Sequence, residues 1–110
     1  MKIAHREFMS DENRYVAYFV YCPACERAHR FIVENEADSE HVWAFNFDWE
    51  APTFHPSLLV EGSVWDGEKF VPDICHSFVE AGVWKFQGDC THGMANQNVP
   101  MVDFPENYRV

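Results

Sequence analysis

Two cysteines separated by two residues are the strongest chemical signal in this chain. Cys22-Pro23-Ala24-Cys25 follows a run of β-branched and aromatic residues. In a turn of this kind both sulfurs lie close enough to bind one tetrahedral ion. Thioredoxin-like redox motifs share the spacing, but they open a helix in an alternating strand–helix context. Because no such helix is indicated here, the spacing favours zinc over a redox pair.

A zinc ion needs two further protein ligands in a structural site, or one ligand and a water molecule in a catalytic site. Cys90 and His92 have the Cys-x-His spacing that puts both side chains on one face of an extended chain. Cys75 and His76 are adjacent, so we expect only one of them to bind. The candidate ligands for one Zn²⁺ are Cys22, Cys25, Cys75, His76, Cys90 and His92, with His29 as a further candidate.

A β-hairpin within residues 73–92 is the element that would position these ligands. Val79 and Val83 flank Glu80-Ala81-Gly82. A three-residue loop that ends in glycine suits a type I turn with Gly82 in the left-handed conformation. We therefore expect Val79 to pair with Val83.

This register assigns the side chains of the hairpin to two faces. The predicted apolar face carries Ile74, His76, Phe78, Trp84, Phe86, Cys90 and His92. The opposite face carries Cys75, Ser77, Val83, Lys85 and Gln87. The simplest zinc tetrads are Cys22, Cys25, Cys90 and His92, or the four cysteines. The register favours the first tetrad, and a change of one residue in the turn would exchange Cys75 for His76.

Two other chemistries use neighbouring residues. If three protein ligands leave the zinc open, a bound water molecule becomes a nucleophile, with His76 and Asp89 as general base or orienting group. Ser57 and His55 resemble a nucleophile and its base by composition. However, residues two apart in a strand stand parallel, and the G-x-S-x-G elbow is absent from the sequence. The sequence therefore does not favour a serine hydrolase.

The composition limits the function classes. The chain has 110 residues, 47% of them hydrophobic, with 18 acidic and 8 Lys or Arg residues and a formal net charge of −10. This charge disfavours nucleic-acid binding, which requires basic residues opposite phosphates. The polar start lacks a secretory signal, and the longest apolar run is too short to span a membrane. We therefore expect a cytoplasmic protein with four cysteines that bind metal or stay reduced.

The remaining sequence predicts a mainly β, single small zinc-ribbon-like domain of antiparallel strands and hairpins over residues 1–110. Tyr15–Tyr21 and Arg30–Val33 flank the cysteine turn as a strand and its return, which is the outline of half a zinc ribbon. Residues 1–14 are predicted to be a loosely ordered arm or an edge strand over Ile3–Phe8. Further strands are expected over His41–Phe47, Thr53–Val60 and Asn98–Asp103, with a short hairpin around Asp66-Gly67.

Five motifs occur in order along the chain. They are Cys22-Pro23-Ala24-Cys25, Trp43-Ala44-Phe45-Asn46, Pro52-Thr53-Phe54-His55-Pro56-Ser57-Leu58-Leu59, Cys75-His76-Ser77-Phe78 and Asp89-Cys90-Thr91-His92. In these motifs the chain resembles, from about residue 15 to 102, a family of small phage and prophage proteins of unassigned function. Some members carry an "ammonia monooxygenase" label that nothing in this sequence supports. The sequence departs from the family pattern at His55, where Ser is usual, and at Phe47, where Gly is usual. The resemblance implies a phage or prophage source and a joint role for Cys75, His76, Cys90 and His92.

The sequence predicts a zinc-binding protein-interaction module of phage type in the cytoplasm of a bacterial host. Its partner would be a host or phage protein, with no role for nucleic acid or membrane. Two alternatives stay open. One is a zinc-dependent hydrolase with an open coordination site that His76, Asp89 and Ser57 would line. The other is an acidic decoy that inhibits a host nucleic-acid enzyme, which the net charge alone suggests.

Overall fold

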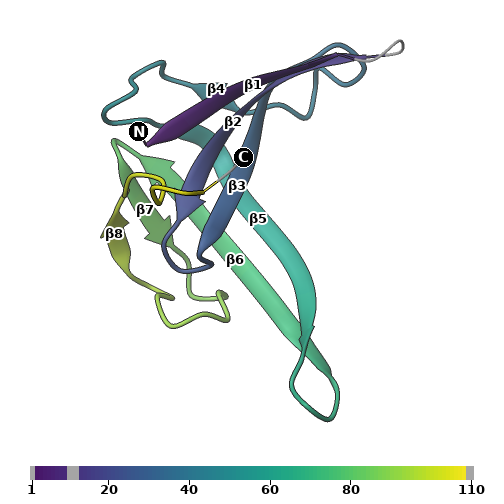
Figure 1. The fold of residues 1–110 in the computed structure, drawn as a ribbon, viewed down its shortest axis with the longest axis vertical. Coiled ribbons are helices and arrows are strands. Elements are labelled where there is room, and N and C mark those ends of the chain that lie inside the picture. Colours follow the sequence, from purple (N-terminus) through teal and green to yellow (C-terminus); the bar gives the residue numbers. More distant parts are fainter. Residues whose placement is uncertain (1, 10–12, 109–110) are drawn as a thin grey trace.

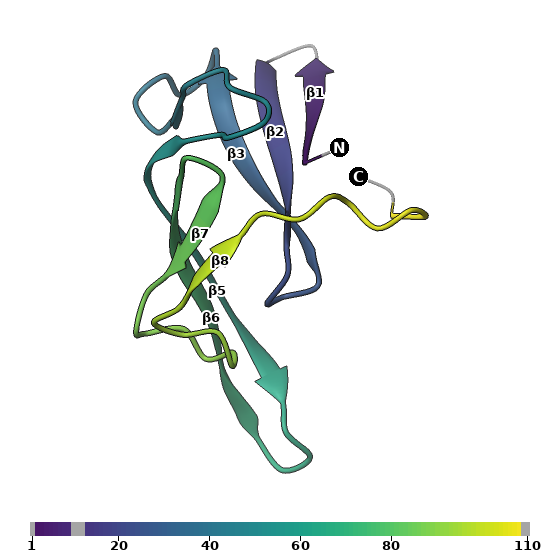
Figure 2. The ribbon, with the colours of Figure 1, turned by 90° about the vertical axis from the view of Figure 1, so that its left-hand side faces the viewer.

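The computed structural model describes residues 2–9 and 13–108, and its regular structure is entirely β. The strands are β1 (Ile3–Met9), β2 (Arg14–Cys22), β3 (Arg27–Asn35), β4 (Ala44–Phe45), β5 (Phe54–Trp65), β6 (Phe70–Glu80), β7 (Val83–Phe86) and β8 (Asn98–Pro100). They form two antiparallel sheets, with strand orders β1-β2-β3 and β4-β5-β6-β7-β8 (Figures 1 and 2). The predicted mainly β, antiparallel class is confirmed.

Within the described ranges, no helix is long and apolar enough to cross a membrane.

The three-stranded sheet contains the cysteine turn. β2 and β3 are the predicted strand and its return, and the turn between them closes with the N–H of Glu26 donating to the C=O of Cys22 at 2.8 Å. Glu26 takes a positive φ of 55°, which brings the chain back sharply toward β3. β1 pairs with β2 as an edge strand, although Met1 and residues 10–12 of the expected arm lie outside the described residues.

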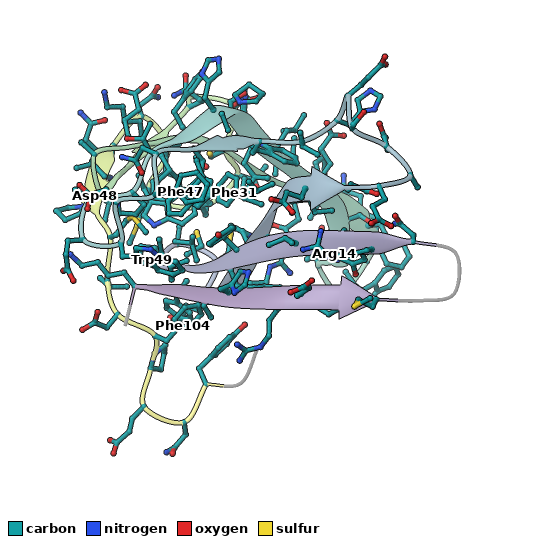
Figure 3. The ribbon with its side chains drawn as sticks, turned by 90° about the horizontal axis from the view of Figure 1, so that it is seen from above. Arg14, Phe31, Phe47, Asp48, Trp49 and Phe104 are labelled. Carbon is teal, nitrogen blue, oxygen red and sulfur yellow. The ribbon has the colours of Figure 1, made fainter. Side chains whose placement is uncertain are left out.

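Aromatic side chains fill the space between the two sheets. Phe31 of β3 stacks on Phe54 of β5 with ring centroids 4.1 Å apart, and Phe45 of β4 stacks on the same ring at 4.7 Å. Tyr18 of β2 packs against Phe45 at 4.7 Å. Figure 3 shows Phe31 in this layer. Burial of each large side chain stabilises the fold by about 2 kcal/mol, so this cluster contributes much of what holds the sheets together.

The β6–β7 hairpin corrects the predicted register. Glu80 pairs with Val83, and Val79 pairs with Trp84, so the turn has two residues rather than three. Gly82 has the expected positive φ, 78°, but Ala81 has one as well, 48°. Two consecutive positive φ values define the tight turn that matches the twist of a hairpin. The expected pairing of Val79 with Val83 is therefore wrong.

Contacts from a neighbouring loop explain this choice of turn. The N–H of Ala81 donates to Thr53 Oγ1 at 2.8 Å, and the N–H of Gly82 donates to the C=O of Pro52 at 2.9 Å. A Cβ atom on Gly82 would lie 3.2 Å from the Cα of Ala51. These tertiary contacts, which the local sequence does not reveal, favour the left-handed conformation at both residues.

The changed register exchanges the two faces of β6. The buried face of the hairpin carries Cys75, Ser77, Val79, Trp84 and Phe86. His76 therefore faces outward and Cys75 faces the core, which is the opposite of the prediction. The sequence identified this exchange as the consequence of a one-residue change in the turn.

β5 is longer and β4 is shorter than the sequence predicts. β5 and β6 form a long ribbon that extends away from the rest of the molecule (Figure 1). Of the expected strand over His41–Phe47, only Ala44–Phe45 pairs with β5. The N–H of Trp43 instead bonds to the C=O of Ile32 in β3, and Phe47 turns the chain with a φ of 57°. The segment thus passes from one sheet to the other, which leaves little of it for pairing.

Candidate functional site

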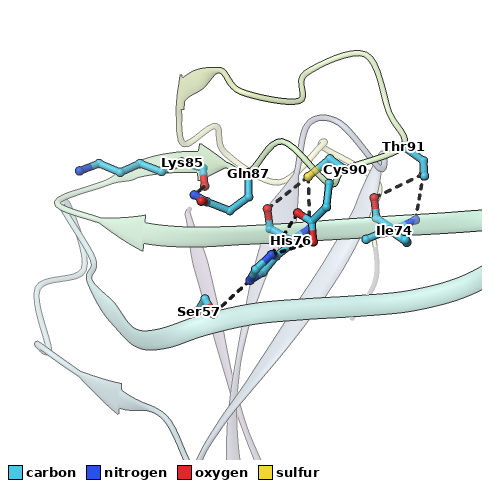
Figure 4. A network of polar contacts seen from close by, with 8 residues as sticks. Ser57, Ile74, His76, Lys85, Gln87, Cys90 and Thr91 are labelled. Carbon is cyan, nitrogen blue, oxygen red and sulfur yellow. Dashed lines mark hydrogen bonds and ion pairs between the residues drawn. The ribbon is translucent and has the colours of Figure 1, made fainter.

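A serine, a histidine and an aspartate lie in line on the outer face of the five-stranded sheet. Ser57 Oγ is 3.3 Å from His76 Nε2, and His76 Nδ1 is 3.1 Å from both carboxylate oxygens of Asp89. Figure 4 shows His76 between β5 and the segment that follows β7, with Ser57 on one side of its ring. We call this group the Ser57–His76–Asp89 triad.

An irregularity in β5 brings Ser57 to this position. Phe54 pairs with Val79 and Leu58 with Ser77, so the chain of β5 carries extra residues between the two pairs. Such a bulge re-aims a side chain, and bulges are common beside active sites. The indole Nε1 of Trp43 donates to the C=O of Ser57 at 3.3 Å and helps to hold the bulged segment.

The segment after β7 brings Asp89 to the other side of the imidazole. It follows β6 closely, with Gln87 N–H donating to the C=O of His76 at 2.8 Å and Thr91 N–H donating to the C=O of Ile74 at 2.9 Å. Between these bonds, Cys90 Sγ lies 3.2 Å from both the N–H and the C=O of His76. The Cys90 thiol therefore accepts from one backbone group and donates to the other, which fixes the residue next to Asp89 against β6 (Figure 4).

The triad has the geometry of an activated nucleophile. A serine hydroxyl is weakly nucleophilic until an adjacent base removes its proton, and a third group must hold that base in the right orientation. The side chain of His76 is 28% exposed and that of Asp89 is 55% exposed, so the site opens to solvent. The distance between Ser57 and His76 lies at the long end for a hydrogen bond, as is common when no substrate is bound.

The sequence named all three residues but did not group them as a triad. It paired Ser57 with His55, whereas His55 is exposed and pairs through its backbone with Ala44. It also placed His76 on the apolar face of the hairpin, and it brought Ser57 near His76 and Asp89 only as residues lining an open zinc site. The signal that would have found the triad is the two-residue hairpin turn, because that register puts His76 on the same face as Ser57.

A second cluster lies on the inner side of β6. Its members come from the end of β2, the cysteine turn, β3 and β6. The ligand atoms of these residues all lie within 4.8 Å of one another, and the residues are Cys22, Cys25, His29 and Cys75. We call this set the Cys₃His cluster. Three thiols and an imidazole are the donor set of a tetrahedral zinc site.

Contacts among the thiols of this cluster shift their pKa values in opposite directions. Hydrogen bonds from Cys22 and then Cys75 stabilise the thiolate of Cys25 and lower its pKa far below the ordinary value. The same contact with Cys25 raises the pKa of Cys22 to about 11. Contacts with Cys22 and Cys25 raise the pKa of Cys75. A buried group of this kind favours a bound cation, which would let all three sulfurs ionise together.

His29 adds a second indication of a metal. Its residue is 4% exposed, and its Nε2 atom has no hydrogen-bond partner among the described residues. A buried polar atom without a partner destabilises a fold unless it binds something. One nitrogen of the His29 ring lies within 4.8 Å of the three sulfurs, so an ion held by the thiols would also bind this buried imidazole, and the residues present fit zinc.

Cys90 and His92 form a further group with Cys75, in which the ligand atoms again lie within 4.8 Å. This group fits an ion less well. The Cys90 thiol already bonds to the backbone of His76, and His92 Nδ1 accepts the N–H of Met94 at 3.2 Å. His92 Nε2, like His29 Nε2, is buried without a hydrogen-bond partner among the described residues. However, a neutral imidazole that accepts at Nδ1 carries its proton on Nε2, and this group offers only three ligands, one of them the Cys75 that it shares with the Cys₃His cluster. His76, the remaining candidate ligand, belongs to neither group and faces Ser57.

The comparisons with known proteins point to one family. A family model described as "Bacterial ubiquitination-like system serine protease (BubE)" matches residues 2–87. The matched range includes Ser57, His76 and three cysteines, and it ends just before Asp89. No curated protein and no solved structure matches the chain.

Proposed function

Since this chain belongs to the family of bacterial ubiquitination-like system serine proteases (BubE), we propose that it is a serine protease with Ser57 as nucleophile. The observation that carries the proposal is the alignment of Ser57 Oγ, the His76 ring and the Asp89 carboxylate on one face of the sheet. The family description names a serine protease, and a serine beside a histidine and an aspartate is the arrangement that such chemistry uses. Its substrate would be a protein of such a system, and the bond that is cleaved would be the one between a carbonyl carbon and its leaving group.

The reaction would follow from the roles of the three side chains. Ser57 Oγ attacks the carbonyl carbon while His76 Nε2 takes the hydroxyl proton, and the leaving group departs with that proton. The acyl group is then bound to Ser57 as an ester. Water attacks this ester with His76 again as the base, which releases the acid and restores the hydroxyl. Asp89 holds the Nδ1–H of His76, so that Nε2 is free to accept.

Covalent labelling tests the nucleophile. A fluorophosphonate probe should modify the protein once, and peptide mass spectrometry should place the adduct on Ser57. Ser57→Ala should abolish labelling and lower ester hydrolysis by at least about 10³-fold, while Ser39→Ala, at an exposed position after β3, should change neither. An adduct on another residue, or a Ser57→Ala variant that stays active, would contradict the assignment.

We propose further that zinc occupies the Cys₃His cluster as a structural ion. Four protein ligands close a tetrahedral shell and leave no position for a reactive water, so this site differs from an open hydrolytic zinc site. The ion would join the cysteine turn and β3 of one sheet to β6 of the other. Four potential ligand atoms within 4.8 Å of one another, three thiols and the buried imidazole of His29, support the proposal.

Metal content tests the zinc site. Mass spectrometry of protein purified without chelator should give one zinc per chain, and X-ray absorption should show three sulfur neighbours and one nitrogen. Because Cys22, Cys25, Cys90 and His92 would give the same spectrum, variants must separate the two tetrads. His29→Ala should lose most of the zinc, and Cys90→Ser should retain it. The reverse result would restore the tetrad that the sequence favoured.

The role of a pure interaction module gains less support from the structure, because a triad on an exposed face has no purpose in such a module. A host or phage protein as partner stays a prediction, and a protein substrate would be one such partner. The acidic decoy also stays a prediction, with salt-sensitive binding to a basic protein as its test.

A further inference from the structure

The outer edge of β5 is open beside the nucleophile. β4 pairs with β5 only at Phe54 and His55. Beyond His55, no other described strand pairs with β5 on this side, since β6 lies on the other. The C=O of Ser57 accepts from the Trp43 indole, so the open edge begins just after Ser57 and runs from Leu59 along the ribbon in Figure 1.

The register shows which backbone groups face this edge. Leu59 pairs with His76, and the C=O of His76 accepts the N–H of Gln87 on the β7 side. When one residue of an antiparallel pair directs its backbone groups to the strand on its far side, the two residues form a non-hydrogen-bonded pair. Both residues of such a pair turn their N–H and C=O groups away from each other. Leu59 therefore directs its N–H and C=O to the open edge. Glu61, which pairs with Ile74, does the same, because the C=O of Ile74 accepts from Thr91.

These groups are the donors and acceptors that an added strand would use. A peptide that joins an open sheet edge gains main-chain hydrogen bonds whatever its sequence. Leu59 and Glu61 lie two and four residues from Ser57, and side chains two apart in a strand share a face. A peptide on this edge would therefore pass Ser57 within a few residues, and the Leu59 side chain, 48% exposed, would lie beside the reacting bond.

We propose that the substrate binds as an added strand on the β5 edge from Leu59 to Ser63, with its acyl side along this edge and its reacting carbonyl at Ser57. The inference rests on the proposed function. The occupant is an extended, proline-free segment of a protein substrate, about five residues long by the rise of a strand. We assign the part of the substrate on the acyl side of the reacting bond to this edge. This part stays bound to Ser57 while the ester forms and while water hydrolyses it, so its contacts with the edge can stabilise both transition states.

A second copy of this chain is a poorer occupant. Each copy carries a net charge of −10, and Glu61 lies on the edge itself. Pairing two such edges would bring like charges together, which disfavours association. A substrate segment that is neutral or basic meets no such repulsion.

The test compares thioesters of increasing length. N-acetylated alanine oligomers of one to five residues, each ending in a thiobenzyl ester, differ in the backbone that they offer to the edge and have the same reacting group. For the unaltered protein, kcat/KM should rise about tenfold or more from one residue to five, as two or three hydrogen bonds are added. A kcat/KM that does not change with length would overturn the proposal.

Proline substitutions on the edge supply the matched variants. Leu59→Pro and Glu61→Pro each remove an N–H that faces the edge and none that bonds to β6, which is the position where a strand tolerates proline. Both should lose the gain with length, measured within each variant as the ratio of kcat/KM for the five-residue thioester to that for the one-residue thioester. Leu59→Ala, which changes only the side chain, should keep the gain. A gain that survives in both proline variants would overturn the edge assignment.

Two further results separate this inference from the proposed function. No hydrolysis of any thioester, with no fluorophosphonate adduct on Ser57, would overturn both. Sedimentation that shows a dimer in the unaltered protein and a monomer in Glu61→Pro would assign the edge to a second copy and overturn the substrate assignment alone.

Discussion

At the scale of single residues, His76 contacts two groups of different chemistry through the two nitrogens of its ring. Nε2 faces a hydroxyl and Nδ1 faces a carboxylate, so the carboxylate selects the tautomer in which Nε2 can accept a proton. Replacement of His76 by Ala should leave Ser57 without a base and lower fluorophosphonate labelling by at least about 10³-fold. His55→Ala, which removes the histidine nearest Ser57 in sequence, should leave labelling unchanged. The opposite pattern would make His55 the base.

In the proposed mechanism Asp89 positions His76, and its exposure limits this contribution. Loss of a buried carboxylate from a triad costs about 10⁴-fold in kcat, but the Asp89 side chain is 55% exposed and water screens its charge. We expect Asp89→Asn to lower kcat on a small ester by about 10²-fold, with little change in KM or in the urea midpoint of unfolding.

Two variants control this experiment. Asp89→Glu should recover part of the activity, which a merely structural role would not require. Asp38→Asn removes another exposed His–Asp contact, the one with His41, and should leave ester hydrolysis unchanged. Equal losses in kcat for Asp89→Asn and Asp38→Asn would exclude the positioning role.

At the scale of elements, the two-residue turn of the β6–β7 hairpin decides which face carries chemistry. Gly82 has a φ of 78° and lies against the backbone of Ala51, so Gly82→Ala should destabilise the protein by about 1–3 kcal/mol. Ala81→Gly should change stability little, because relief of about 1–2 kcal/mol of left-handed strain is largely offset by the backbone entropy of glycine. Urea unfolding of both variants measures the difference. A Gly82→Ala variant as stable as Ala81→Gly would show that the turn does not determine the register.

Much of this architecture was predictable from local sequence. The strands that became β2, β3 and β5 have β-branched and aromatic residues, and Gly82 indicated the turn. The register was not predictable, because Thr53 and Pro52, far from the turn in sequence, accept the N–H groups of Ala81 and Gly82. Without the register, Cys75 and His76 could not be assigned to the correct faces. The candidate residues were therefore found, and their grouping into a triad and a thiol cluster was not.

At the scale of the whole molecule, the proposed zinc would join the two sheets. The ion would then contribute several kcal/mol, a large share of the roughly 5–15 kcal/mol that stabilises a domain. Removal of zinc by a strong chelator should unfold the protein or lower its urea midpoint sharply, and ester hydrolysis should fall in parallel. Added Zn²⁺ should restore both, as followed by circular dichroism and by turnover. Ser57→Ala should bind zinc normally. Full activity after complete removal of zinc would contradict the structural role.

Cys75 and His76 are neighbours on β6 that face opposite sides of the sheet, one toward the Cys₃His cluster and one toward Ser57. This has a practical consequence for inhibitor profiling. Thiol alkylating agents and chelators should inhibit the protein without reaching the nucleophile, by displacing the strand that carries its base. A crude extract assayed with standard inhibitors would then suggest a cysteine protease or a metalloprotease. Only a reagent that marks the reacting hydroxyl itself would assign the enzyme to its class.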